Sequence, residues 1–597
     1  NNRIAKARIK DIGYGDIPFR GILFFDKSGF LQYGYSVQIE LKSSSDWWEI
    51  LINAKSGEII DKANYTISCT PTAFTNRSHL ERKEFHDDKT LPLTKSAVIL
   101  QDTHECYLVF PYPLESPYHG PQSLVTNPAD TTASPFGWHD TNGAAGPEYT
   151  ITRGNNVWAK EDQNGDNEST IGFSPDGGDS LVFNNPIHLN NAPSTYEAGA
   201  VTNLFYWNNL VHDVMHYYGF DEASGNFQET NYSGDGAGSD FVYADAQDDG
   251  NCNANFSTPP DGSNPRMQMY TCNQSNPSHD SDLDNGVVVH EYGHGISNRL
   301  TGGSGNSFCL SNTEQMGEGW SDYFAMVFTM KPGDMGADKR GMGNYLVGDP
   351  INGDGIRPFP YSIDFNINPQ TYDHVKSVSV PHGVGSVWCS MLWEMTWGLI
   401  DKYGYDSDLY HGTGGNNIAL RLVTEGLKLQ TCSPGFVDGR DAILRADTLL
   451  SGGSNSCVIW EAFAKRGLGV SADQGSSSSV SDGTQAFDLP PGSPANCLDD
   501  SDFFVTADPF AQKACDTFRF NLSFYTNTEI QHVVGLTTIG LQDTVDIIFS
   551  EISVTVPDQV SLVVIDTIGL PDSTTYSFSV IASNGTEMDT IPLQITT

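Results

Sequence analysis

Basic residues are scarce in this chain of 597 residues. Lys and Arg together number 32 against 74 Asp and Glu, so the formal net charge is −42 at pH 7. A surface this acidic repels phosphate groups and anionic lipids, which argues against nucleic-acid binding and against a charged membrane as partner. The excess of carboxylates is typical of a soluble extracellular protein, and it also offers oxygen ligands for calcium.

Long apolar runs and closely paired cysteines are absent too. Without a run of 18 apolar residues, no transmembrane segment is predicted. No signal peptide stands at the start, and we interpret Asn1 as a processed or truncated end. We expect a secreted protein, free or associated with a cell surface.

The ten cysteines form no Cys-x-x-Cys metal pair. An even number in a secreted chain favours disulfides, with buried free thiols as the alternative. The spacing suggests local bonds within three pairs and, as looser alternatives, within two more. The three are Cys252 with Cys272, Cys432 with Cys457 and Cys497 with Cys515, and the two are Cys69 with Cys106 and Cys309 with Cys389.

The most informative segment is residues 290–294, H-E-Y-G-H. Positions i and i+4 share one face of an α-helix, so His290 and His294 can both reach one metal ion, and Glu291 can hold a metal-bound water. Capping residues at 281–285 predict that a helix starts here. A histidine pair on a helix surface is the alternative. The helix-weakening glycines Gly293 and Gly295 suggest close approach of another element or of substrate.

A catalytic zinc takes three protein ligands and keeps one position open for water. Glu318 and Asp322 lie one helical turn apart at the start of an apolar segment, residues 323–328, that predicts a buried helix. We expect Glu318 to be the third ligand and Asp322 to accept a hydrogen bond from the non-ligating nitrogen of a histidine. The alternative is a pair of acidic residues at a solvated helix start.

These motifs, together with R-L-T-G-G at 299–303 and G-E-G-W-S-D at 317–322, resemble the fungalysin family of secreted metalloendopeptidases. In detail, their sequences resemble the bacterial, flavobacterium-like branch of the family more than the fungal one. The resemblance covers roughly residues 110–470. It implies an α+β, two-lobed zincin with one zinc. Such an enzyme would hydrolyse peptide bonds of extracellular proteins by glutamate-assisted attack of a zinc-bound water. The alternative is an extracellular binding or adhesion protein on an inactive metallopeptidase scaffold.

Further roles follow from the resemblance. Glu291 would be the general base, and His382, at the start of a helix predicted at 383–402, would stabilise the oxyanion, oriented by Asp373 or a backbone carbonyl. A capping histidine is the alternative. Asn253 and Ala254 resemble the edge strand that pairs with substrate, with an ordinary structural strand as the alternative. Finally, Arg357 could bind a substrate carbonyl.

Two other segments have patterns that could indicate metal sites. His212 and His216 are a second i, i+4 pair on a helix predicted at about 195–219, but no acidic third ligand follows, so we interpret that helix as a packed element. Oxygen-bearing side chains alternate at Asp162, Asn164, Asp166 and Glu168, as at the start of a calcium loop, with a solvated acidic turn as the alternative.

The chain divides into four regions. Residues 1–68 are β-rich and similar to the C-terminal part of a propeptide, which would act as an intramolecular inhibitor. Residues 69–105 are a polar linker, and residues 106–488 the catalytic domain, with a flexible stretch at 470–488. Residues 489–597 fit an all-β, Ig-like sandwich. Within the catalytic domain, strands at 240–246, 253–256 and 266–270 are expected to be antiparallel, and helices to dominate from residue 287 onwards.

Overall fold

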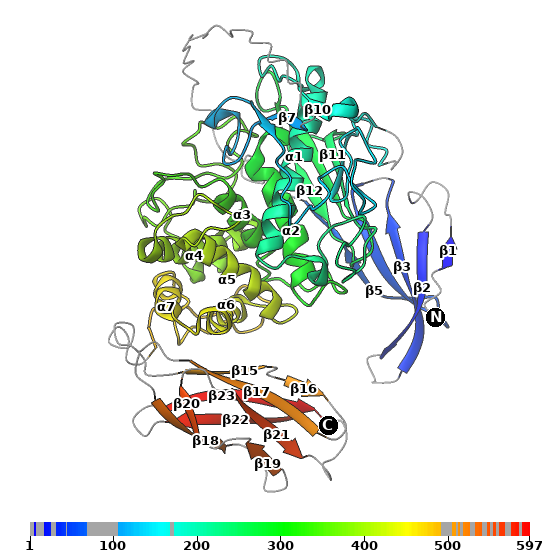
Figure 1. Ribbon diagram of the computed structural model, residues 1–597. Coiled ribbons are helices and arrows are strands. Elements are labelled where there is room, and N and C mark those ends of the chain that lie inside the picture. The colour runs from blue at the N-terminus through cyan, green and yellow to red at the C-terminus, as the bar shows by residue number, and fades with distance from the viewer. Residues whose placement is uncertain are drawn as a thin grey trace.

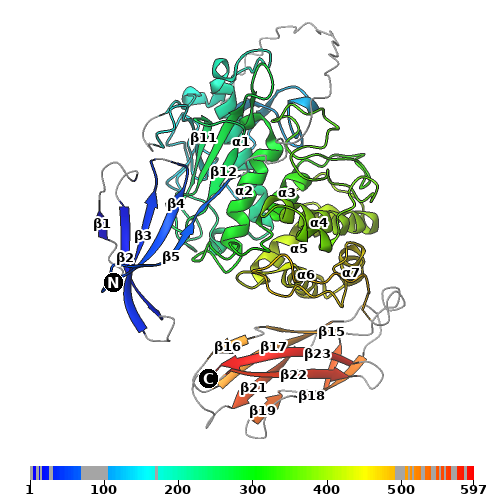
Figure 2. The ribbon, with the colours of Figure 1, turned by 180° about the vertical axis from the view of Figure 1, so that it is seen from behind.

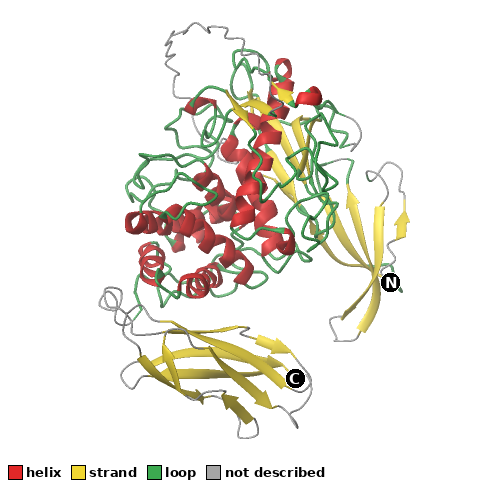
Figure 3. Cartoon of the chain, viewed as in Figure 1, coloured by secondary structure: helices red, strands yellow, loops and turns green. Residues whose placement is uncertain are grey.

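The computed structural model describes residues 5–7, 13, 17–25, 31–42, 44–68, 105–167 and 172–490, and the strands between residues 504 and 596. Strands dominate both ends of the chain and helices its centre, as Figure 3 shows. The protein is thus of mixed α and β structure, with the helices following a central sheet in the sequence.

The first five strands form an antiparallel sheet in chain order. They are β1 (Ala5–Ala7), β2 (Ile17–Phe25), β3 (Leu31–Glu40), β4 (Trp47–Asn53) and β5 (Ile59–Asn64). The β-rich character expected of residues 1–68 is confirmed by these strands. The next strand, β6 (Thr66–Ser68), leaves this sheet and joins the central one.

The central sheet has the order β6-β12-β13-β11-β9, and a short β14 also pairs with β13. Its further strands are β9 (Val157–Glu161), β11 (Val242–Asp248), β12 (Ala254–Ser257), β13 (Arg266–Cys272) and β14 (His279–Asp280). The expectation of antiparallel strands is wrong for β11 and β13, which run parallel, whereas β12 is antiparallel to β13. The reason is that β12 lies on the side of β13 away from β11. The chain reverses direction once between β11 and β12 and again before β13, so β13 runs in the direction of β11.

Seven helices of the described residues complete the central unit. They are α1 (Glu197–Tyr217), α2 (Asn285–Leu300), α3 (Gly317–Phe328), α4 (His382–Tyr403), α5 (Gly415–Leu429), α6 (Phe436–Ser451) and α7 (Ser456–Lys465). Helices α1 to α4 lie where the sequence predicts them, and α5 to α7 confirm that helices dominate from residue 287 onwards. Figures 1 and 2 show α1 and α2 against the sheet, with α3 to α7 on the side of α2 away from it. A smaller sheet of β7 (Cys106–Val109), β8 (Ser123–Thr126) and β10 (Val182–Phe183) packs near α1.

The expected flexible stretch at 470–488 is instead fixed on the central unit. Its backbone forms bridges between Asp473 and Thr484 and between Leu468 and Ala486. The carbonyl of Ser477 accepts hydrogen bonds from the Glu314 backbone and from the Asn312 side chain. Small Ser and Gly side chains leave the backbone free for such bonds, so here they permit close packing.

The disulfides differ from the expected set. Cys252 and Cys272 are bonded, as expected. However, Cys432 is bonded to Cys309, which rules out the expected bonds of Cys432 with Cys457 and of Cys309 with Cys389. The loop after α2 lies against the loop before α6, where the Ser433 N–H donates to the Cys309 carbonyl at 2.8 Å, so residues distant in sequence meet.

Of the remaining cysteines, Cys457 is also disulfide-bonded. Cys106 and Cys389 are buried free thiols, which rules out the expected bond of Cys69 with Cys106. The bond expected between Cys497 and Cys515 is not confirmed, because both cysteines lie outside the described residues. That pair stays a prediction, and the linker up to residue 104 also lies outside the described residues.

The C-terminal strands form two sheets, β15-β17-β21-β19 and β16-β23-β22-β18-β20 (Figure 1). Their bounds are β15 (Phe504–Asp508), β16 (Ala511–Lys513), β17 (Thr517–Tyr525), β18 (His532–Ile539), β19 (Asp546–Phe549), β20 (Ser553–Val556), β21 (Val560–Asp566), β22 (Thr575–Ser583) and β23 (Met588–Thr596). Among the helices that the structure describes, none has the length and apolar character needed to cross a bilayer.

Candidate active site

Helix α2 carries the H-E-x-x-H segment and is buried along its whole length. Asp284 caps it by accepting a hydrogen bond from the Val287 N–H at 3.4 Å. Gly293 faces α3, and a Cβ at this position would lie 2.9 Å from the Cα of Ser321. Because glycine has no Cβ, the two helices cross closely enough to bring Glu318 opposite the histidines.

His290, His294 and Glu318 meet at this crossing. The Nε2 of His290 lies 3.1 Å from the Nε2 of His294 and 3.5 Å from Oε2 of Glu318. His294 Nε2 is 3.7 Å from Glu318 Oε1. Ligand atoms about 2.0–2.1 Å from one zinc, at tetrahedral angles, are about 3.4 Å apart. The three donor atoms therefore fit a single zinc ion, and the donor set is one that zinc prefers.

Behind the histidines, Asp322 lies one turn after Glu318 on α3, and its Oδ1 is 2.7 Å from the Nδ1 of His290. Arg357 forms a bidentate ion pair with the same carboxylate, in which Nε donates to Oδ2 at 2.6 Å and Nη2 donates to Oδ1 at 2.7 Å. The Nη2 atom also reaches Glu318 Oε2 at 3.2 Å. Tyr361 donates its hydroxyl to Oδ2. Asp322 thus fixes the His290 ring so that Nε2 faces the proposed ion.

Burial and neighbouring charges oppose each other in this cluster. Burial would raise the pKa values of Glu318 and Asp322, but the surrounding His and Arg side chains hold both well below their usual range. Burial lowers the pKa of His294 to about 3. It would also lower that of His290, but the carboxylates of Asp322 and Glu318 raise it to about 9. An ionised Glu318 and a neutral His294 are the forms that bind a cation.

His382 opens α4 on the other side of Glu318, with its Nε2 3.5 Å from Oε1. Its side chain is 14% exposed, more than the other members of the cluster. Gly385 permits this approach, because a Cβ there would overlap the Cβ of Glu318. Burial lowers the pKa of His382, against the opposing effect of Glu318. Asp373, considered as its orienting partner, pairs with Lys376 instead.

The remaining predicted catalytic residue, Glu291, follows His290 on α2 and is fully buried. A small cavity opens beside His290. It is lined by Ala254, Val287, His290, Met342, Leu346, Ile356 and Arg357. Its walls are apolar except for the imidazole and the guanidinium, and its volume of about 10 Å³ leaves room for about one water molecule next to the zinc ligands.

Strand β12 lies above α2, and β6 of the N-terminal segment pairs along its outer edge. Asn255 faces Ser68, and Ser257 faces Thr66, in antiparallel register. The hydroxyls of Thr66 and Ser257 are 2.6 Å apart. The edge expected to receive a substrate is thus covered by the chain itself.

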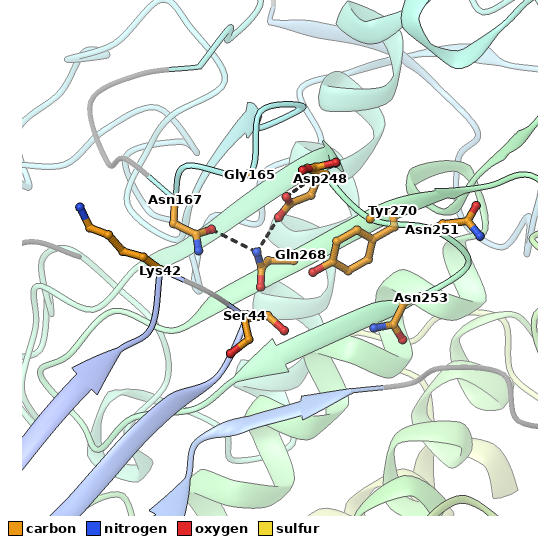
Figure 4. Close-up of a pocket in the computed structure, with 12 residues that line it drawn as sticks. Lys42, Ser44, Gly165, Asn167, Asp248, Asn251, Asn253, Gln268 and Tyr270 are labelled. Carbon is orange, nitrogen blue, oxygen red and sulfur yellow. Dashed lines mark hydrogen bonds between the residues drawn. The ribbon is translucent and has the colours of Figure 1, made fainter. Parts of the chain in front are cut away.

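Asn253 precedes β12 and lines a polar cavity on the outer face of the sheet, shown in Figure 4. Lys42 and Ser44 of the N-terminal segment line its other side. Two strand residues of the catalytic unit, Tyr270 and Gln268, form its floor with Asp248. The N-terminal segment therefore borders Asn253 as well as β12.

Three of the four predicted calcium residues lie in one turn. The Asn164 side chain donates to Asp166 at 2.7 Å and the Asp166 N–H to Asp162 at 3.2 Å, whereas Glu168 lies outside the described residues. Asp162 also gathers with Asp245 and Asp248, which could hold a metal ion by distance alone. Asp245, however, already pairs with Lys160 at 3.3 Å and with Arg266.

The second histidine pair behaves as a packed element. His212 is buried, with Nδ1 2.9 Å from Asp213 Oδ1 and Nε2 3.2 Å from the side-chain amide of Asn226. His216 is partly buried. Neither belongs to a potential metal-binding group among the described residues.

Two histidines one turn apart and a glutamate from a crossing helix, with a buried glutamate beside the first histidine, define the scaffold of an H-E-x-x-H metallopeptidase. The fungalysin metallopeptidase (M36) family matches residues 106–472, and the chain belongs to that family.

The chain is similar to extracellular metalloproteinases of fungi. It is 41% identical to extracellular metalloproteinase 2 of Phaeosphaeria nodorum over 409 residues, which is 66% of this chain and 62% of that protein. It is 42% identical to the extracellular metalloproteinase of Pyrenophora tritici-repentis over 407 residues, 66% of this chain and 61% of that protein. The chain thus spans about three fifths of the length of these relatives.

Sequence reasoning missed one member of the cluster, Tyr361. No motif marks it, because its partner Asp322 is 39 residues away in sequence and the intervening segment is mostly loop. For Arg357, the sequence suggested a substrate contact, and the ion pair with Asp322 could not be foreseen for the same reason.

Proposed function

We propose that the protein is a secreted zinc-dependent endopeptidase that hydrolyses peptide bonds of extracellular proteins. The observation that carries this proposal is the convergence of His290, His294 and Glu318 on one point, with spacings that suit a tetrahedral zinc site. The names of the fungal relatives support the reaction and the extracellular location, and the disulfides support the location. The finer assignment to a bacterial branch stays a prediction, since the relatives named above are fungal.

Zinc held by His290, His294 and Glu318 would polarise the scissile carbonyl and make water more acidic. Glu291 would take the proton from the attacking water and pass it to the leaving amine. His382, on the more open side of the site, would donate a hydrogen bond to the developing oxyanion. Ala254 and Asn253 would align the substrate backbone.

We also propose that residues 1–68 act as an inhibitor of this site. Three features support this role. β6 lies along β12, the edge proposed for the substrate. The ring of Tyr65 stacks on Phe308 at 4.4 Å between centroids. Glu40 pairs with Arg266 of the central sheet at 3.4 Å. A peptide substrate that paired with this part of β12 would have to displace β6, and the other two contacts help to hold the segment in place.

The other regions keep the roles that their sequence predicts. Residues 489–597 would form an Ig-like accessory module, and their pairing into two sheets supports a sandwich. Calcium binding near Asp162 stays a prediction, and the pairing of Asp245 with Lys160 and Arg266 speaks for a paired network instead.

The test is the Glu291→Gln substitution in the full chain, assayed on casein with and without a chelator. The amide keeps the shape of the carboxylate but cannot accept the proton, so we expect hydrolysis to fall about 10²–10⁴-fold while bound zinc, measured by metal analysis, is unchanged. Hydrolysis at the wild-type rate, or wild-type hydrolysis that a chelator does not affect, would contradict the proposed function.

A further inference from the structure

We propose that Tyr361 is a positioning residue that holds the carboxylate of Asp322 against His290 and so sets the affinity of the site for zinc. This inference rests on the proposed function for the identity of the metal. Tyr361 itself lies outside the motif segments and does not touch the three ligands in the contacts that the structure records. It acts through Asp322.

The two oxygens of Asp322 have different neighbours. Oδ1 faces the His290 Nδ1 and the Nη2 of Arg357, each at 2.7 Å. Oδ2 receives the Nε of Arg357 at 2.6 Å and the hydroxyl of Tyr361. All four groups are buried. The hydroxyl therefore fixes the carboxylate from the side opposite His290, and rotation of Asp322 about its last bond would break this contact.

Arg357 is shared between two carboxylates. It forms the bidentate ion pair with Asp322, and its Nη2 also reaches Glu318 at 3.2 Å. In the recorded contacts the Tyr361 hydroxyl bonds Asp322 and not Glu318, so it can hold Asp322 while Arg357 adjusts to Glu318.

The backbone of Tyr361 is itself held firmly. It forms a bridge with Arg340, with N–H to O distances of 2.7 and 3.0 Å in the two directions. Arg340 in turn bonds the Thr329 hydroxyl at the end of α3 and the Glu115 carboxylate, each at 2.7 Å. The hydroxyl is therefore presented to Asp322 from a rigid support, which is what an outer partner of a metal ligand requires.

The test is Tyr361→Phe in the full chain, with the zinc dissociation constant measured by competition with a chromophoric chelator. Loss of the hydrogen bond between a zinc ligand and its outer partner typically weakens binding about 10- to 100-fold. Tyr361 supports that partner, Asp322, and Arg357 stays in place, so we expect the lower end of this range, about 10-fold. The matched control is Tyr292→Phe, which removes a buried hydroxyl from α2 itself that has no hydrogen-bond partner in the structure. It should leave the constant unchanged.

A double-mutant cycle with Asp322→Asn separates positioning from general stability. If Tyr361 acts through Asp322, Tyr361→Phe has little further effect on zinc affinity in the Asp322→Asn background. With saturating zinc, we expect kcat of the single variant to fall and KM for a peptide to stay the same.

Unchanged zinc affinity in Tyr361→Phe, or equal losses in both backgrounds, would overturn the inference. These measurements of zinc affinity do not use peptide hydrolysis. The role of Tyr361 can therefore be disproved while the proposed function stands. Conversely, the Glu291→Gln test can contradict the proposed function while the role of Tyr361 in zinc binding is supported.

Discussion

Two kinds of buried carboxylate in this protein differ in whether neighbouring cations outweigh the effect of burial on the pKa. Glu318 and Asp322 lie beside histidines and an arginine, which keep their pKa values low. Glu314, in the loop before α3, is buried with a hydroxyl instead: Tyr372 donates to its Oε1 at 2.5 Å. Burial, together with Asp482 and Asp438, raises the pKa of Glu314 to about 8. The first group suits cation binding, whereas the second makes the fold sensitive to pH.

Glu314→Gln should therefore remove a pH-dependent loss of stability. The folded protein holds the Glu314 proton up to about pH 8, whereas the unfolded chain releases it near the usual glutamate pKa of 4.5. The contribution of Glu314 to the free energy of unfolding is therefore fully present below about pH 4.5. It falls by up to about 1.4 kcal/mol per pH unit as the pH rises to about 8. In the variant, Tm should fall less over this window.

The measurement is Tm of both proteins from about pH 5 to about pH 9, which spans this window. Glu461→Gln, at an exposed position of α7, is the control and should follow the wild type. Parallel Tm profiles for Glu314→Gln and the wild type would show that Glu314 is ionised throughout.

For single residues, the sequence predicts correct positions where the residues concerned lie close together in the chain. The two histidines and the pair Glu318 and Asp322 could be placed because i, i+4 residues share a helix face. The contacts of Arg357 and Tyr361, and the bond between Cys309 and Cys432 across 123 residues, could not, because they depend on how distant loops pack.

Among the elements, β6 is the one whose position matters most for function. It is only three residues long, yet it covers the edge of β12 and directly follows Tyr65. Tyr65 is 2% exposed, stacks on Phe308 and receives a hydrogen bond from Gln38 at 3.0 Å. Helices were predictable from composition and periodicity, but strand pairing was not: neither the parallel β11 and β13 nor the transfer of β6 to another sheet leaves a local pattern.

Tyr65→Ala in the intact chain should increase its residual hydrolysis of a small fluorogenic peptide. The substitution removes the stacking contact and about 1 kcal/mol or more of its interaction with Phe308, so β6 should leave the edge more often, and we expect roughly a 10-fold increase in rate. Tyr33→Ala is the matched control, because Tyr33 is 51% exposed on the same N-terminal sheet. If Tyr65→Ala hydrolyses the peptide no faster than Tyr33→Ala, β6 does not limit access to the site.

For the whole molecule, the question is how residues 1–68 are held on the catalytic unit. Among the described residues, the attachment includes the β6 pairing, the ring of Tyr65 and the ion pair of Glu40 with Arg266. In one chain, the covalent tether gives the N-terminal segment a high effective concentration near the cleft, so these contacts suffice to keep it in place. Without the tether, binding would depend on concentration.

Proteolytic cutting between residues 69 and 105 should therefore activate the protein in a concentration-dependent way. The cut chain should gain specific activity on dilution, as residues 1–68 dissociate, whereas the intact chain should show the same low specific activity at every concentration. A cut between the central unit and the C-terminal sheets, after residue 490, is the control and should not activate. Specific activity that rises on cutting but does not change with dilution would mean that the segment leaves irreversibly. Equal activity of cut and intact chains at all dilutions would mean that the segment covering β12 does not inhibit, and that substrate reaches the zinc ligands by another side of the cleft.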